Sequence, residues 1–183
     1  MQDTVRQRGY TLIEILVVVA MIGVMLLVVV PNFIGYLRTI RMKTSVRQFT
    51  TDVRQARQTA ITRHVQTKLS FKDDASGEYW FSRRNEDCSG VGTLPDPDPC
   101  WQALGAHKFA QKNVFFDSTS TFADVAAGIT PDPDGFKDVV FGTDGTVSNL
   151  PSGTGTVVIA TNDDVPKKQY TVTFWQTGRL VTN

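Results

Sequence analysis

The sequence has few of the side chains from which enzymes and metal centres are built. Only two of its 183 residues are histidines and only two are cysteines. Neither His64 nor His107 lies in a pattern typical of metal binding or nucleophilic catalysis, and isolated histidines are usually structural. The sequence therefore predicts no catalytic activity, no cofactor and no bound metal.

The chain also lacks an excess of charge of either sign. Its 19 Lys and Arg against 18 Asp and Glu leave a formal net charge of +1, which gives no overall preference for nucleic acid or a membrane surface. The charges are nevertheless segregated. Residues 31–68 hold eight basic residues and one acidic residue, whereas residues 69–183 hold nine basic and fifteen acidic residues, a net charge of −6.

Polar residues are almost absent from residues 10–30, where only Thr11 and Glu14 interrupt a run of apolar side chains. A helix of this length measures roughly 31 Å, close to the ~30 Å hydrocarbon core of a bilayer. Residues 10–31 are therefore predicted to form one transmembrane helix. A cleaved secretory signal fits less well, because its apolar region covers only about 7 to 15 residues and ends in a small-residue site, whereas this run ends at Pro31.

Glu14 places a carboxylate within this apolar run. An ionised side chain at the centre of a membrane helix costs about 2.5–3.5 kcal/mol, so such groups are usually paired. One interpretation puts Glu14 close enough to the membrane surface to reach water. The other supplies a cation: cleavage after Gly9 would give Tyr10 a free α-amino group, which would stabilise a nearby carboxylate at low dielectric.

The stretch "RGYTLIE", residues 8–14, followed by an apolar helix, resembles the class III leader of type IV prepilins and type II secretion pseudopilins. The resemblance implies that residues 1–9 are a leader peptide, that prepilin peptidase cuts after Gly9, and that the new N-terminus at Tyr10 is methylated. It also implies that Glu14 pairs with the terminal amine of a neighbouring subunit and fixes the register of assembly. Tyr10 is a mild departure, because the family more often has Phe there.

Pro31 lies at the end of the apolar run. Proline lacks an N–H and its ring crowds the preceding turn, so Pro31 is predicted either to end the helix or to kink a helix that continues. The helical pattern resumes beyond it, which favours the kink. Resemblance to pilins implies that this weak stretch can extend when subunits pack into a filament.

Residues 32–66 are predicted to form an amphipathic helical stem. Five apolar residues recur at spacings of three and four and define one stripe: Val46, Phe49, Val53, Ala56 and Ala60. The arginines on the other faces are interpreted as a solvated surface, with a basic surface for acidic neighbouring subunits or DNA as the alternative. The run from residue 49 to residue 63 resembles the stem of the GspH/FimT branch of pilin-like proteins.

After residue 66 apolar and polar residues alternate, as in β-strands. Five further segments up to residue 181 have strand character, and Asp144-Gly145 between valine-rich flanks indicates a hairpin. Residues 67–183 are therefore predicted to form a β-rich head. The expected fold class is α+β and pilin-like, with a long N-terminal helix packed on one mainly antiparallel sheet. The end of the head also resembles GspH/FimT proteins, whereas residues 84–135 show no such resemblance.

Both cysteines lie in this middle part and bracket an irregular, proline-rich segment. A disulfide between Cys88 and Cys100 would contribute about 3 kcal/mol by restricting the unfolded chain, and it would indicate an oxidising compartment. Free thiols are the alternative. The apolar helix predicts a single-pass membrane protein and the disulfide a head in an oxidising compartment, and the resemblance to pilins implies the bacterial inner membrane with the head in the periplasm. Basic residues soon after the apolar run argue for the opposite orientation, but large domains can be translocated regardless of charge.

The acidic stretch "DPDGFKD", residues 132–138, offers three carboxylates. Asp132, Asp134 and Asp138 could ligate Ca²⁺, but the stretch lacks the distal glutamate of a calcium-binding loop. An ordinary Pro/Asp turn is therefore the preferred interpretation.

The leader, Glu14, the apolar helix and the stem together predict an assembly subunit. This would be a minor pilin or pseudopilin of a type IV pilus or a type II secretion pseudopilus, in its tip or initiation complex. The expected partners are prepilin peptidase, other pilins or pseudopilins, and inner-membrane lipid. The sequence does not distinguish the two machines, and a membrane-tethered domain that never polymerises is a less specific alternative.

DNA binding is the alternative function. Some FimT-type minor pilins bind DNA through a basic Gly-Arg-x-Arg tail, and here the tail reads "GRLV", residues 178–181, without the second arginine. Lys167, Lys168 and Arg179 could form a small basic edge, although the acidic charge of the head would repel phosphate. DNA contact at these three residues is therefore expected to be weak.

Overall fold

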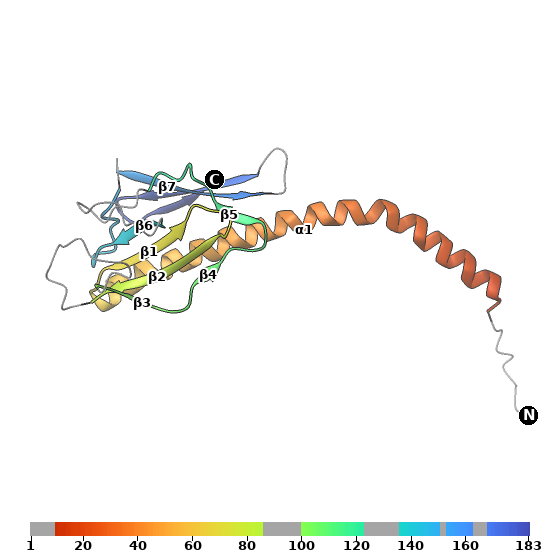
Figure 1. Cartoon of the computed structure of the whole chain (residues 1–183), viewed down its shortest axis with the longest axis horizontal. Helices are drawn as coiled ribbons and strands as arrows, with labels where there is room; N and C mark the ends of the chain where they lie inside the picture. Colours follow the sequence, from red (N-terminus) through yellow and green to blue (C-terminus); the bar gives the residue numbers. More distant parts are fainter. Residues whose placement is uncertain (1–9, 86–99, 123–135, 151–152, 163–167) are drawn as a thin grey trace, which may run out of the picture. The chain divides into compact units, whose positions relative to one another are not determined.

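The computed structural model describes residues 10–85, 100–122, 136–150, 153–162 and 168–183 of the chain. The chain divides into two compact units, Met1–Ile40 and Arg41–Asn183. Helix α1, Leu12–Arg63, begins in the first unit and ends in the second, and all β-strands belong to the second (Figure 1).

Both ends of helix α1 have recognisable capping residues. Thr11 precedes the first helical residue, and its hydroxyl oxygen accepts a hydrogen bond of 3.3 Å from the N–H of Glu14, which is the role of an N-cap. At the other end His64 has a φ of 53°, the left-handed conformation that commonly terminates a helix. The helix continues through position 31, so Pro31 does not end it, and the kink there stays a prediction.

In the first unit, the helix leaves its apolar side chains uncovered. The exposed fractions of its large hydrophobic residues reach 84% at Leu12 and are still 40% at Ile40. Within the part of the chain that the structure describes, no helix is both long enough and apolar enough to cross a membrane. The transmembrane assignment of residues 10–31 therefore stays a prediction.

In the second unit, helix α1 buries the stripe predicted from the spacing of its apolar residues. All five predicted residues are buried, and Met42 extends the stripe by one turn toward the N-terminus. These side chains belong to the hydrophobic core of the unit. The predicted stripe thus lies on one buried face of α1, and the helix ends at Arg63, three residues before the predicted end of the stem at residue 66.

Nine strands in the described residues form two antiparallel sheets (Figure 1), which confirms the predicted α+β fold of a long helix packed on antiparallel β-structure and adds that this structure is divided in two. The first sheet has the order β3-β2-β1-β6, and β4 also pairs with β2. Its strands are β1 Thr67–Lys72, β2 Glu78–Arg84, β3 Trp101–Ala103, β4 Lys108–Phe109 and β6 Phe136–Phe141. The second sheet has the order β5-β7-β8-β9. Its strands are β5 Val114–Phe116, β7 Thr154–Thr161, β8 Gln169–Trp175 and β9 Leu180–Thr182.

One hydrophobic core joins the helix to both sheets. Phe49 of α1 shows the arrangement: its ring centroid lies 5.6 Å from that of Tyr79 on β2 and 5.2 Å from that of Phe116 on β5. Aromatic rings at these distances add to the free energy gained from burial alone. The helix stripe therefore stabilises both sheets at once.

Strand β1 has the predicted alternation of apolar and polar residues, and both of its faces are buried. Leu69 and Phe71 belong to the core. On the opposite face Lys68 and Ser70 are also buried, and both contact Asp138 of the neighbouring strand β6, at 3.2 Å and 2.6 Å. The polar residues of β1 therefore form a buried network instead of a solvated face.

The turn predicted at Asp144-Gly145 is present. Gly145 has a φ of 78°, and the carboxylate of Asp144 accepts hydrogen bonds from the N–H and the hydroxyl of Thr146, at 3.0 Å and 2.7 Å. These bonds hold the pKa of Asp144 below its ordinary value. Beyond the turn only Val147 forms a bridge, with Phe141, so the hairpin is shorter than its sequence suggested.

Candidate functional site

The first candidate site is the start of helix α1. Tyr10 lies just before the helix with 80% of its surface exposed, and Glu14 is exposed in the first turn. Gly9 lies outside the described residues. The spacing from Thr11 to Glu14 is that of a capping box, a signal present in the sequence that our interpretation of Glu14 did not use. A carboxylate in the first turn is also stabilised by the positive end of the helix dipole.

An apolar surface continues from this start. Almost all large hydrophobic side chains that are exposed in the described residues lie between Tyr10 and Ile40. Those that lie elsewhere are Ile61, Leu104, Phe109 and Trp175. An apolar surface of this extent marks a region that contacts another protein or lipid.

The second candidate site lies where α1 meets the turn between β8 and β9. Arg57 donates hydrogen bonds from Nε to the carbonyl oxygen of Gly145, at 2.8 Å, and from Nη2 to that of Thr177, at 2.9 Å. A Cβ at position 178 would overlap both the Arg57 guanidinium and the Gly145 carbonyl oxygen, so Gly178 permits this close approach. Arg57 is thus a structural link between helix and turns, which corrects its interpretation as part of a solvated face.

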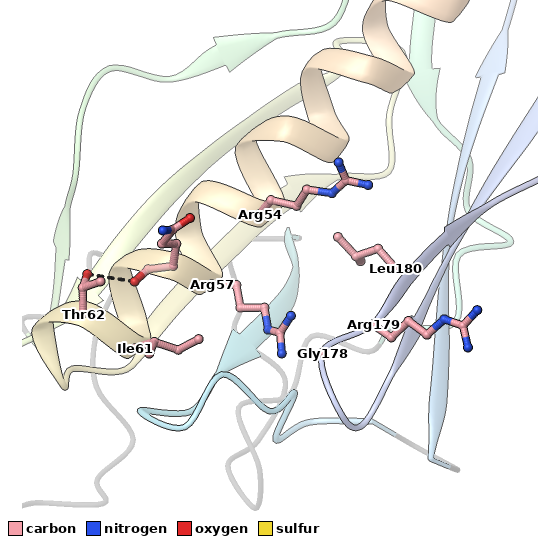
Figure 2. Close-up of a pocket in the computed structure, with 8 residues that line it drawn as sticks. Arg54, Arg57, Ile61, Thr62, Gly178, Arg179 and Leu180 are labelled. Carbon is pink, nitrogen blue, oxygen red and sulfur yellow. Dashed lines mark hydrogen bonds between the residues drawn. The ribbon is translucent and has the colours of Figure 1, made fainter.

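A pocket of about 430 Å³ lies beside this link. Arg54 and Arg57 extend toward it from the helix (Figure 2), and Arg179, which follows β8, also lines it, although its guanidinium points away from the helix. Ile61 and Leu180 give it an apolar wall. The ion pairs among the described residues involve none of the three arginines. The pocket is therefore positively charged.

The basic edge predicted from the sequence is not formed. Lys168 directly precedes β8, whereas Arg179 follows its other end. A seven-residue strand separates its ends by roughly 20 Å. Lys167 lies outside the described residues, and DNA contact at any of these residues stays a prediction.

A buried ionic cluster links the helix to the first sheet. Asp52 accepts hydrogen bonds of 2.8 Å from the hydroxyl of Tyr79 and from Nζ of Lys108. Burial, together with the nearby Asp52 carboxylate, raises the pKa of Tyr79 above its ordinary value of 10.0. In the sequence, Asp52 stands out only as the single acid among the basic residues of positions 31–68. No local signal could have identified partners 27 and 56 residues away.

His107 and Asp138 both contact other side chains. Nδ1 of His107 lies 2.5 Å from Oε1 of Glu78, and Asp138 is engaged by side chains of β1. Asp132 and Asp134, its proposed companions in a calcium site, lie outside the described residues. In the described part of the chain no group of three or more His, Cys, Asp or Glu could hold a metal ion.

Cys100 directly precedes β3 and is disulfide-bonded. Its carbonyl oxygen accepts a 2.9 Å hydrogen bond from the N–H of Asn85, which places it beside the end of β2. Cys88 lies outside the described residues, so the bridge between Cys88 and Cys100 stays a prediction.

Pilin-like subunits have this architecture: a helix with an uncovered apolar start, continued by an amphipathic part that packs on antiparallel sheets. The family model of the prokaryotic N-terminal methylation motif matches residues 5–30, and that of the type II transport protein GspH matches residues 45–178. The chain belongs to the GspH family.

Solved structures with the same fold include two minor filament subunits. The minor pseudopilin EpsH from the type II secretion system of Vibrio cholerae is 16% identical, with a TM-score of 0.51 over 78% of this chain and 92% of EpsH. The type IV minor pilin FimU of Pseudomonas aeruginosa is 11% identical, with a TM-score of 0.51 over 81% of this chain and 92% of FimU. No curated protein sequence matches the chain. Fold and family together identify a minor pilin or pseudopilin subunit.

Proposed function

We propose that this subunit is cleaved by prepilin peptidase between Gly9 and Tyr10 and then enters the tip or initiation complex of a type IV pilus or type II secretion pseudopilus. Before cleavage, residues 10–31 hold it in the inner membrane, with its head in the periplasm. The supporting observation is the apolar surface between Tyr10 and Ile40, which the described residues leave uncovered. Lipid covers this surface before assembly, and neighbouring pilins or pseudopilins cover it afterwards.

The start of helix α1 suits this processing. Tyr10 is exposed and not helical, so the bond before it can adopt the extended conformation that a peptidase requires. Cleavage there leaves Thr11, the N-cap, in place, and the mature chain keeps its helix start. The new α-amino group of Tyr10 becomes methylated and lies at the end of an apolar surface, where an anionic partner stabilises it.

Glu14 supplies that partner in our proposal, through pairing with the amine of a neighbouring subunit. The capping box offers a competing role within the same chain. The two roles make different demands, because glutamine can serve in a capping box but cannot neutralise an ammonium group. Glu14→Gln therefore separates assembly from helix capping.

The test is the amount of mature subunit recovered in purified filaments, with the N-terminus examined by mass spectrometry. Mature wild-type protein should begin with methylated Tyr10. Glu14→Gln and Glu14→Ala should both lower incorporation by roughly tenfold, the effect of one lost charge-assisted bond. Thr11→Ala, which removes only the cap, should have a much smaller effect.

Normal incorporation of Glu14→Gln together with poor incorporation of Glu14→Ala would show that Glu14 acts by capping. An intact leader on the filament-associated protein would contradict the cleavage proposal. A full membrane-bound yield with no filament-associated fraction would support a tethered domain instead.

A further inference from the structure

The pocket between α1 and the β8–β9 turn has a positive charge that the described residues do not neutralise. Arg54 and Arg179 are exposed, and Arg57 is half-buried. None of the three pairs with an aspartate or glutamate in the described residues. Like charges around one cavity repel each other, so an anion that enters the pocket is stabilised by Arg54 and Arg57, with Arg179 adding positive charge at its edge.

The guanidinium of Arg57 is held in an orientation that suits such an anion. A guanidinium has five N–H donors in a rigid plane, and two of those in Arg57 are directed at the carbonyl oxygens of Gly145 and Thr177. These bonds fix the plane while other donors remain for a ligand. A planar, fixed guanidinium suits a carboxylate, which can accept two parallel hydrogen bonds.

The other residues that line the pocket, together with its volume, indicate the apolar character and the size of the ligand. Ile61 and Leu180 are apolar, and Ile61 is exposed in the absence of a partner. A volume of about 430 Å³ lies at the small end of the range for ligand pockets, about 300–1,000 Å³. The pocket therefore fits a short segment that carries one carboxylate next to an apolar side chain.

An extended polyanion fits this surface less well. Nucleic acid presents a phosphate charge every ~1.7 Å along a duplex and is bound by rows of basic residues. Here the arginines gather at one pocket, Lys168 lies at the far end of β8, and residues 69–183 carry a net charge of −6. A single carboxylate avoids most of the repulsion that a chain of phosphates would meet.

We propose that this pocket binds an acidic segment of another filament subunit, with an Asp or Glu carboxylate against Arg54 and Arg57 and an adjacent apolar side chain against Ile61 and Leu180. The inference rests on the assembly function proposed above and names the contact surface of the head. It is independent of Glu14, so the two proposals can fail separately. Arg57 both supports the turns and lines the pocket, which makes Arg54 the cleaner position for a test.

The experiment is a calorimetric titration of the full chain in non-ionic detergent with two capped peptides, acetyl-Leu-Glu-Leu-amide and acetyl-Leu-Gln-Leu-amide. The glutamate peptide should bind about tenfold more tightly than the glutamine peptide, and Arg54→Gln should abolish most of this difference. Arg179→Gln, at the other side of the pocket, should weaken binding of the glutamate peptide less. Arg47→Gln is the matched control, because Arg47 is also exposed on α1 but does not line the pocket.

Four results would overturn the proposal. Equal binding of the two peptides would show that the pocket does not recognise a carboxylate. An equal loss of the preference for the glutamate peptide in Arg47→Gln would show that the preference comes from the overall positive charge of the helix and not from the pocket. Tighter binding of a single-stranded oligonucleotide, lost in Arg54→Gln, would assign the arginines to phosphate, and self-association lost in that variant would assign the pocket to a second copy. Normal processing and Glu14-dependent incorporation alongside any of these results would leave the assembly function intact.

Discussion

The two parts of helix α1 use their apolar residues in opposite ways. Up to Ile40, almost all described large apolar side chains of the helix are exposed, whereas from Met42 to Ala60 the apolar side chains form one buried stripe. The first part therefore requires apolar surroundings supplied by other molecules, and the second part is satisfied by the core of its own unit. One continuous helix thus carries both an uncovered apolar surface and the stripe that packs into the core of the head.

The largest expected effect tests this contrast with two phenylalanines of the same helix. Phe49→Ala removes a buried ring that touches both sheets, so the free energy of unfolding of the head should fall by about 3–5 kcal/mol. Phe33→Ala removes a ring that is exposed in the first part, and it should leave that free energy unchanged. Urea unfolding of the full chain in detergent, followed by tryptophan fluorescence, measures the head alone because Trp80, Trp101 and Trp175 all lie there.

A similar loss of stability in both variants would contradict the division of the helix into an uncovered part and a core part. Retention of head stability by Phe33→Ala but reduced recovery of the variant in filaments would sharpen the division, since it would locate the function of the exposed ring outside the head.

Arg57 also holds the second part of the helix, through its hydrogen bonds to the turns. Substitutions at two glycines test this contact. Gly178 and Gly153 both have positive φ values, 74° and 77°. A Cβ at position 153 meets no atom within 4 Å, whereas one at position 178 overlaps the Arg57 guanidinium. Gly153→Ala should cost about 1 kcal/mol of unfolding free energy from the backbone alone, and Gly178→Ala about 2–3 kcal/mol because a collision is added.

The measurement is again urea unfolding, and the difference between the two alanine variants is the informative quantity. In the Arg57→Ala background the excess cost of Gly178→Ala should largely disappear, because the side chain that the new Cβ meets is then absent. An unchanged excess would mean that the Gly145 carbonyl oxygen, not Arg57, limits the space.

Much of the fold could be predicted because it is encoded by local periodicity. The stripe on α1 follows from spacings of three and four, and the strands follow from alternation. The division into two sheets could not be predicted, because it depends on remote pairings such as Val114 with Thr161. The burial of Lys68 and Ser70 on β1 could not be predicted either, because their partner Asp138 lies about 70 residues away in the sequence.

The two candidate sites also differ in whether the sequence could predict them. The residues at the start of α1 are adjacent in sequence, so a motif can identify them, and the Thr11–Glu14 capping box was equally readable. The arginine pocket combines residues more than a hundred positions apart, Arg54 and Arg179. Its charge could be counted from the sequence, but the convergence of its walls depends on the docking of the β8–β9 turn against the helix.

The smallest expected effect concerns the pH dependence of the buried contact between Asp52 and Tyr79. Because burial raises the pKa of Tyr79 above its ordinary value of 10.0, the unfolded chain loses this proton at a lower pH than the folded chain. The stabilisation is therefore complete below pH 10.0 and declines as the pH rises above it. Tyr79→Phe should lower the unfolding free energy by about 1 kcal/mol at neutral pH, through the lost hydrogen bond. The difference in unfolding free energy between Tyr79→Phe and wild type should then become smaller at alkaline pH. If the two stability curves stay parallel up to the highest accessible pH, the contact between Asp52 and Lys108, and not the Tyr79 hydroxyl, is what holds the second part of the helix.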